Sequence, residues 1–177
     1  MKNLKATKNY LRSVGRQTVA NAKNTLRTKG ITGSDLENSI SYKLVKKGNS
    51  YILEFTMSQY GEFMDKGVSG NKKKQYYKDE TGKRTRSPYS YKGKMPPVKV
   101  FEKWIAKKGI RGRSKKTGRF ITRQSTAFAM AKHRQINGYA GLSFFSTPLK
   151  NILTKFPKNL LNSIEKDFLK SIDPKIK

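Results

Sequence analysis

The side chains that could act as acids, bases or metal ligands are few in this 177-residue chain. Its one histidine, His133, stands between Lys132 and Arg134, and the neighbouring sequence offers it no second metal ligand and no catalytic partner. Metal sites and general bases both need such partners. We therefore predict no chemical role for His133.

The 11 Asp and Glu residues are equally scattered. Asp79 and Glu80 are adjacent in a predicted turn, and Glu62 and Asp65 are three residues apart on a predicted helix. A metal-dependent nuclease needs several converging carboxylates. The sequence also lacks a glycine-rich phosphate loop, a nucleophile elbow and a Ser-His-Asp arrangement. It predicts a protein that is not an enzyme and that uses no metal and no cofactor.

Positive charge is the chemistry that the chain does offer. The 40 Lys and Arg residues give a formal charge of +29, far above what solubility requires of a small domain. A chain of this charge repels itself unless an anion is near. We expect some of the most densely spaced cations to face DNA or an acidic neighbouring protein. The alternative is that they form a solvated face. These cations are Lys72, Lys73, Lys74, Lys83, Arg84, Arg86, Lys115, Lys116 and Arg119.

Length and composition limit the architecture. A chain of this length suits one domain with a real core. The absence of cysteine excludes disulfides and thiolate metal sites, and it is consistent with assembly in the cytosol. The N-terminus has no apolar stretch typical of a signal peptide, and no segment approaches the roughly 18 apolar residues of a membrane span. We expect a soluble protein with no membrane span.

The first 58 residues predict a helix and a hairpin. Leu4, Leu11, Val14, Thr18, Ala22 and Leu26 have near-helical spacing, and Gly30 is placed to end that helix. This apolar side of the helix favours packing on a sheet. The alternative is a helix that binds a membrane surface or nucleic acid. Residues 40–46 and 51–56 then alternate as strands of an antiparallel pair, with a turn at 47–49.

A basic arm covers residues 68–95 and is longer than most structureless loops. Its centre predicts a hairpin, because "QYYK" and "KRTR" flank "DETG", where Gly82 suits a positive φ. The arm has few apolar residues to offset the entropy of ordering. We therefore expect it to be disordered in the free subunit and ordered against a partner.

Helices dominate the remainder. Pro97 suits the first position of a helix that Gly109 ends, a basic turn follows at 111–125, and residues 126–136 predict a short helix. Residues 137–145 read as a glycine-broken loop, after which Thr147 is a predicted N-cap. Pro157 should kink or divide the helical stretch, and Asp173-Pro174 should end its last helix.

Four aromatic residues are candidates for the core or for an interface. Trp104 is predicted to lie in the core rather than to serve as a binding platform. The pair Phe144 and Phe145 either fills the core beneath the sheet or packs on a neighbouring subunit. Phe63 shares a short predicted helix with Tyr60 and Met64. The fold class that these elements predict is α+β, with a long N-terminal helix packed on a twisted antiparallel sheet, further helices and a basic extended arm.

Four segments, in order, resemble the neck and tail-completion (head-tail joining) proteins of tailed bacteriophages. They are "TGSDLENSI", "YGEFMDKGVSG", "MPPVKVFEKWIAKKGI" and "AFAMAKHRQINGYAGLSFFSTPL". The matching positions are Thr32, Gly33, Leu36, Ser39, Ile40, Tyr60, Phe63, Met64, Asp65, Gly67, Pro96, Pro97, Trp104, Gly138, Gly141, Phe144 and Phe145. The resemblance covers about residues 1–155, and it predicts a joining-like domain there with a C-terminal helical extension at 156–177. The long arm, the second basic turn and that extension depart from the family pattern.

The resemblance implies a structural virion protein, assembled in the host cytoplasm, that forms a homo-oligomeric ring around the DNA channel. A ring of six or twelve copies would contact itself, portal or adaptor proteins and tail proteins. Its basic side chains would contact genomic DNA without reading sequence. The alternative is a sequence-independent nucleic-acid-binding protein that acts outside a virion, with tyrosines of the arm stacking on bases.

Overall fold

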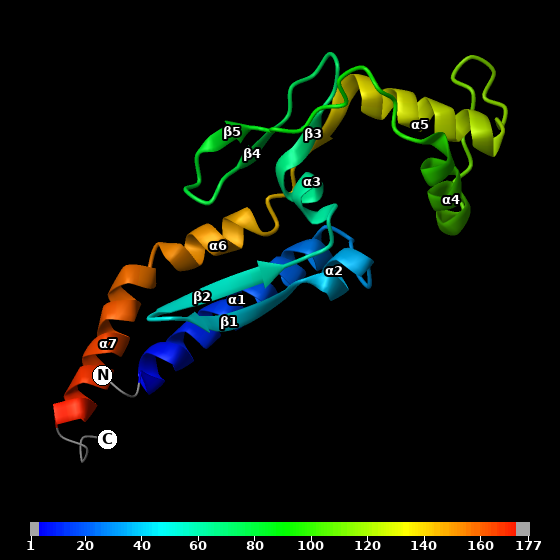
Figure 1. The fold of residues 1–177 in the computed structure, drawn as a ribbon. Helices are drawn as coiled ribbons and strands as arrows, with labels where there is room; N and C mark the ends of the chain where they lie inside the picture. Colours follow the sequence, from blue (N-terminus) through cyan, green and yellow to red (C-terminus); the bar gives the residue numbers. More distant parts are fainter. Residues whose placement is uncertain (1–3, 173–177) are drawn as a thin grey trace. The chain divides into compact units, whose positions relative to one another are not determined.

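The computed structural model describes residues 4–172, which form an α+β fold (Figure 1). Its helices and strands, in chain order, are α1 (Lys5–Thr28), α2 (Asp35–Ser39), β1 (Ser41–Lys47), β2 (Ser50–Thr56), α3 (Gly61–Lys66), β3 (Gly67–Ser69), β4 (Tyr76–Lys78), β5 (Arg84–Arg86), α4 (Val98–Lys108), α5 (Arg123–Asn137), β6 (Gly138–Ala140), α6 (Ser146–Leu153) and α7 (Phe156–Ile172). None of the helices in this described part is both long enough and apolar enough to cross a membrane.

The chain divides into two compact units. Unit 1 comprises residues 1–65, 78–83 and 143–177, and unit 2 comprises residues 66–77 and 84–142. Helix α7 therefore belongs to the same unit as α1. The tip of the basic arm, residues 78–83, also belongs to unit 1, whereas the rest of the arm belongs to unit 2.

Unit 1 is built on α1, which runs along the β1–β2 hairpin as predicted (Figure 1). The two elements approach closely at Gly15, where an added Cβ would lie 2.3 Å from the Tyr42 ring. The helix ends as the sequence predicts, because Gly30 has φ +74°. The N–H of Ile31 bonds the carbonyl of Leu26 at 3.0 Å, and that of Gly30 bonds Arg27 at 2.9 Å. This pair of bonds is a Schellman motif, which satisfies carbonyls at the helix end.

Helices α6 and α7 complete unit 1 and both contact α1. Phe144, just before α6, is fully buried, and Phe145 meets Phe55 edge-on at a centroid distance of 5.3 Å. Phe144 therefore belongs to the core of unit 1, the first of the two predicted places, while Phe145 is half-buried beside it. The division at Pro157 is confirmed, since α6 ends at Leu153 and Pro157 lies in the first turn of α7. The predicted stop at Asp173-Pro174 lies outside the described residues.

Unit 2 combines α4 and α5 with two short strands. β3 pairs antiparallel with β6, so part of the predicted loop at 137–145 is a strand. Gly138 has φ +66°, and a Cβ there would lie 2.0 Å from the Val68 carbonyl oxygen, so only glycine fits this pairing. α4 ends at Gly109 as predicted, and it begins at Val98 with Pro97 as its N-cap.

The basic arm is ordered by polar contacts within the chain, which differs from the expected disorder. β4 and β5 form the predicted hairpin, and Gly82 in its turn has φ +84°. The hydroxyl of Ser87 donates to the Gly67 carbonyl at 2.7 Å, and the Gln75 amide nitrogen donates to the Asn137 carbonyl at 2.7 Å. Both side chains are buried. The prediction of disorder rested on the small number of apolar residues in the arm. Buried hydrogen bonds between side chains and backbone cannot be recognised from composition.

Candidate functional site

Asp65 is buried and binds the N-terminus of α6, 80 residues further along the chain. Its carboxylate accepts from the N–H of Phe145 at 2.7 Å and of Ser146 at 3.3 Å, and also from the Ser146 hydroxyl. The first N–H groups of a helix have no partner within it. The Asp65 carboxylate satisfies these donors and complements the positive end of the helix dipole. This contact also corrects the predicted N-cap, because α6 begins at Ser146 and not after Thr147.

Asp167 performs the same task for α1. Its carboxylate accepts from the N–H groups of Ala6 and Thr7, each at 2.8 Å, and from the Thr7 hydroxyl at 2.7 Å. Burial raises the pKa of Asp167, but the bonds from Thr7 and Ala6 outweigh it and hold the pKa below its ordinary value. α7 is thereby fixed to the start of α1 by a buried carboxylate.

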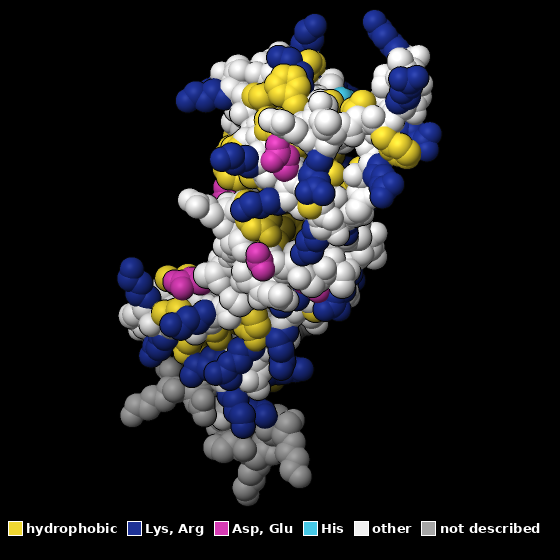
Figure 2. Space-filling view, turned by 90° about the vertical axis from the view of Figure 1, so that its right-hand side faces the viewer, with side chains coloured by type: hydrophobic (Ala, Val, Ile, Leu, Met, Phe, Trp, Pro, Cys, Tyr) yellow, Lys and Arg dark blue, Asp and Glu magenta, His cyan; other side chains and the backbone are white. Residues whose placement is uncertain are grey.

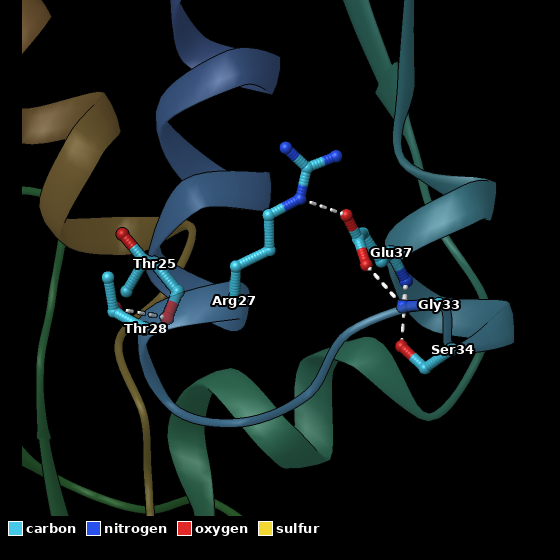
Figure 3. Close-up of polar contacts among 6 residues, drawn as sticks. All are labelled: Thr25, Arg27, Thr28, Gly33, Ser34 and Glu37. Atoms are coloured by element: carbon cyan, nitrogen blue, oxygen red, sulfur yellow. Dashed lines mark hydrogen bonds and ion pairs between the residues drawn. The ribbon is translucent and has the colours of Figure 1, made fainter.

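Glu37 is the third buried carboxylate (Figure 3). It accepts from the Arg27 Nε at 2.5 Å and from the Gly33 N–H at 2.7 Å, and its own N–H bonds the hydroxyl of Ser34, the N-cap of α2. The hydrogen bond from Arg27, and then that from Gly33, hold the pKa of Glu37 below its ordinary value. Glu37 therefore joins the end of α1 to the turn that precedes α2.

These contacts assign a structural task to each buried acid. Oxygens that accept backbone N–H bonds are committed to helix ends, so they are poorly placed to bind a metal or take a proton. Within residues 4–172 no three His, Asp or Glu side chains gather as a metal site requires. His133 is exposed, and its Nδ1 lies 3.3 Å from the Asn137 side-chain nitrogen. Asp79 orders the tip of the arm by accepting from the N–H groups of Thr81 and Lys83.

The nine predicted basic residues are all exposed (Figure 2 shows Lys and Arg spread over one face of the molecule). Lys83 belongs to unit 1 and the other eight to unit 2. In unit 2 they form two groups at opposite ends of α5. The Lys72 N–H bonds the Ile136 carbonyl near the C-terminal end of α5, whereas the turn that holds Lys115 and Lys116 precedes the N-terminal end. A helix of 15 residues separates its ends by roughly 22 Å.

Several arginines of unit 2 lie over aromatic rings, a contact that the sequence did not predict. Arg113 lies 4.2 Å and Arg111 5.8 Å from the centre of the Phe120 ring. Arg84 lies 4.5 Å from the Tyr76 ring. A cation over a ring is attracted by the ring's quadrupole and keeps its full charge. These guanidinium groups are positioned without being neutralised.

Two of the four candidate aromatics lie at the surface. Trp104 is 44% exposed, so its predicted place in the core is wrong, and Phe63 is 37% exposed. Ile105 is the residue of α4 that is buried. The apolar spacing of α4 correctly predicts a helix, but the described residues leave much of Trp104 and Val100 exposed.

A second exposed apolar face lies on α7. Its buried residue is Asp167, whereas five of its large apolar side chains are exposed. Four of them recur at intervals of three and four residues, which places them on one side of the helix. We call them the α7 face: Leu161, Ile164, Phe168 and Ile172. Val100 and Trp104 are called the α4 face.

Comparisons with models of protein families, with curated proteins and with solved structures find no match to this chain. Residues of the second and fourth resembling segments contact each other in the fold. Asp65 caps α6, and Gly67 pairs with Ala140 between β3 and β6. A Cβ on Gly67 would lie 2.4 Å from the Gly141 nitrogen. The second and fourth segments therefore depend on each other in space.

Proposed function

We propose that this chain is a structural protein of a tailed-phage virion, which forms a homo-oligomeric ring at the neck or tail around the DNA channel. The observation that carries the proposal is the pair of uncovered apolar faces, one in each unit. A ring is built from heterologous contacts, in which one surface of a subunit meets a different surface of the next. Four segments resemble head-tail joining proteins in the same order along the chain. This resemblance is the reason for placing the ring at the neck or tail.

The α4 face and the α7 face are suitable partners for such a contact. Contiguous exposed apolar patches mark protein interaction sites on otherwise polar surfaces. Trp104 and Phe168 are large aromatic anchors, the type of residue that dominates interface energetics. We propose that the α4 face of one copy packs on the α7 face of the next copy, with portal, adaptor or tail proteins above and below the ring.

The first test is the mass of the purified protein in high salt, which removes bound nucleic acid. Light scattering and electron microscopy should show a closed ring of defined copy number. Trp104→Ser and Phe168→Ser should each give monomers, while Ile52→Ser, a similarly exposed position on β2, should leave the ring intact. A monomeric wild-type protein at high concentration, with no assembly on portal or adaptor, would contradict the proposal.

Mixing the two monomeric variants tests the pairing of the faces. Each variant keeps one intact face, so a heterologous contact predicts a one-to-one heterodimer that cannot grow further. If the α4 face instead met another α4 face, Phe168→Ser alone would form homodimers. That result would retain self-assembly but reject the proposed arrangement.

The second candidate is a nucleic-acid-binding protein that acts outside a virion. The arginines of unit 2 that lie over aromatic side chains favour it, because an unneutralised guanidinium binds phosphate well. It requires no self-assembly, so a monomer that binds nucleic acid tightly would support this candidate instead.

A further inference from the structure

The loop between α4 and α5 forms a pocket of about 330 Å³ within unit 2. It is lined by Ile110, Arg111, Gly112, Phe120, Ile121, Arg123 and Thr126. The segment is closed by a bridge between Arg113 and Phe120 and by the bond from the Ile121 N–H to the Gly112 carbonyl at 3.0 Å. None of the lining residues is acidic, so the pocket presents apolar walls and two guanidinium groups.

Gly112 allows the loop to approach α5. A Cβ at this position would lie 2.3 Å from the Thr126 hydroxyl oxygen and 2.9 Å from its methyl carbon. Thr126 is itself fixed, because its hydroxyl donates to the Thr122 carbonyl at 3.0 Å. A side chain at position 112 would therefore push the loop away from the helix and open the pocket.

Phe120 holds the arginines at this site. Its ring is 56% exposed, and the guanidinium groups of Arg111 and Arg113 lie over it. Among the described residues, neither arginine has a carboxylate within salt-bridge distance. An arginine that lies on a ring keeps its positive charge and its N–H donors for an anion.

The surroundings contain almost no competing anion. Unit 2 has 20 of the 40 Lys and Arg residues but only one acid, Glu102, which lies on α4. Arg123 is the first residue of α5, and the first turn of that helix has no acidic side chain. An anionic ligand in the pocket would thus meet cations from the loop and from the helix.

We propose that this pocket is a phosphate-binding site for the backbone of nucleic acid, with Arg111 and Arg123 as the phosphate ligands and Phe120 as the residue that positions the loop arginines. Arginine is suited to phosphate because its planar donors can bind two oxygens at once. The site lies outside the nine basic residues already described. It rests on the proposed function only for the source of the phosphate, which would be the genome inside the ring.

The test measures binding of a fluorescein-labelled oligothymidylate and of a labelled duplex to the full-length protein. Arg111→Gln combined with Arg123→Gln should weaken both by about tenfold, since the variant removes two charge-assisted bonds to phosphate. Lys92→Gln combined with Lys94→Gln removes the same charge from exposed positions of unit 2 and should change affinity by about twofold or less. Equal effects of the two double variants would overturn the site.

Phe120→Leu separates positioning from charge. It keeps the net charge and an apolar wall, yet it should weaken binding severalfold, and Phe120→Tyr should restore it because the ring returns. Wild-type affinity for Phe120→Leu would overturn the positioning role. Poly-glutamate that competes as well as inorganic pyrophosphate, at equal ionic strength, would assign the pocket to carboxylates and overturn the phosphate proposal.

Light scattering on every variant keeps this proposal distinct from the ring. If wild-type rings form but bind neither oligonucleotide, the pocket proposal fails and the ring proposal stands. If the pocket variants lose binding in a protein that never forms rings, the ring proposal fails and the phosphate site stands.

Discussion

Arg27 in unit 1 and Arg113 in unit 2 are both held in place, but by different chemistry. Arg27 bonds the buried carboxylate of Glu37 at 2.5 Å, so its charge is paired within the chain. Arg113 lies 4.2 Å from the centre of the Phe120 ring, which positions the guanidinium and leaves its charge intact. The first arrangement stabilises structure, and the second presents a cation to solvent or to a ligand.

The difference extends to the whole of each unit. Unit 2 has a formal charge of +19 over 71 residues, with one acid, whereas unit 1 has +10 over 106 residues, with ten acids. In unit 1 the buried acids Glu37, Asp65 and Asp167 bond backbone N–H groups. We infer that unit 1 uses its charges to hold its helices, while unit 2 uses them to meet an anion.

The largest expected effect is on the core of unit 1. Phe144→Ala removes a fully buried ring and should lower the free energy of unfolding by roughly 3–5 kcal/mol. Trp104→Ala removes a ring of unit 2 that is 44% exposed, so it should cost less than Phe144→Ala while abolishing the ring assembly. Chemical denaturation in the Phe168→Ser background, which should be monomeric, measures both. Comparable losses of stability would show that Trp104 is packed after all.

Next in size is the carboxylate that caps α6. Asp65→Asn keeps the shape but removes the charge that accepts from Phe145 and Ser146, and we expect a loss of about 2 kcal/mol. Asp79→Asn, in the exposed turn of the arm, serves as the matched control with an expected loss under about 1 kcal/mol. Denaturation midpoints at neutral pH give the comparison. Equal losses in the free energy of unfolding for the two variants would show that the buried acids have no special role in stability.

The two units should also respond to opposite ends of the pH scale. Glu37 and Asp167 have folded pKa values below the ordinary 4.5 and 3.8, so their stabilisation of unit 1 is present above those values and is lost as pH falls below them. Burial, and then the neighbouring Tyr91, raise the pKa of Tyr139 from 10.0 to about 12. Its stabilisation of unit 2 is therefore present below pH 10 and is lost between pH 10 and about 12.

Hydrogen exchange resolved along the chain measures this pH response. Amides of α1 should lose protection first in acid, and those of β3 and β6 first in alkali. Simultaneous loss in both units at either extreme would contradict the assignment of these groups.

The smallest expected effect concerns the base of the arm. The N–H of Ser69 bonds the Tyr89 carbonyl at 2.8 Å, and that of Ser87 bonds Gln75 at 2.9 Å. Both amides should be protected from hydrogen exchange in the monomer, and Ser87→Ala should reduce that protection by about 1 kcal/mol. Exchange of both amides at the rate of an unfolded chain would restore the expectation of a disordered arm.

The sequence predicts local elements well and distant contacts poorly. α1, the β1–β2 hairpin and α4 follow from residue spacing and from the glycines at their ends, which act within a few residues. The bond from Asp65 to α6 spans 80 residues and that from Asp167 to α1 spans 160, so no local period can indicate them. The prediction for Trp104 is wrong for a related reason: spacing shows that a helix has an apolar side but not whether another element covers it.

The candidate site is predicted by the sequence only in part. The density of charge identifies the exposed lysines and arginines, and the structure places eight of the nine in unit 2. Phe120 and Arg123 lie within the basic segment 111–125, but charge density does not single them out, because it counts cations and not the aromatic ring beside them. The signal that could identify them is an aromatic residue between arginines in a segment without acids, at residues 111–123.

The salt dependence of DNA binding by two matched triple variants tests the division between the units most directly. Lys115→Gln, Lys116→Gln and Arg119→Gln remove three exposed cations from unit 2, and Lys43→Gln, Lys46→Gln and Lys47→Gln remove three from β1 in unit 1. If the first set binds phosphate, the slope of log affinity against log salt should become shallower by up to about 2.7, at about 0.9 for each phosphate that is no longer neutralised. The second set should leave the slope unchanged. Equal changes in slope would contradict the claim that unit 2 carries the contact with nucleic acid.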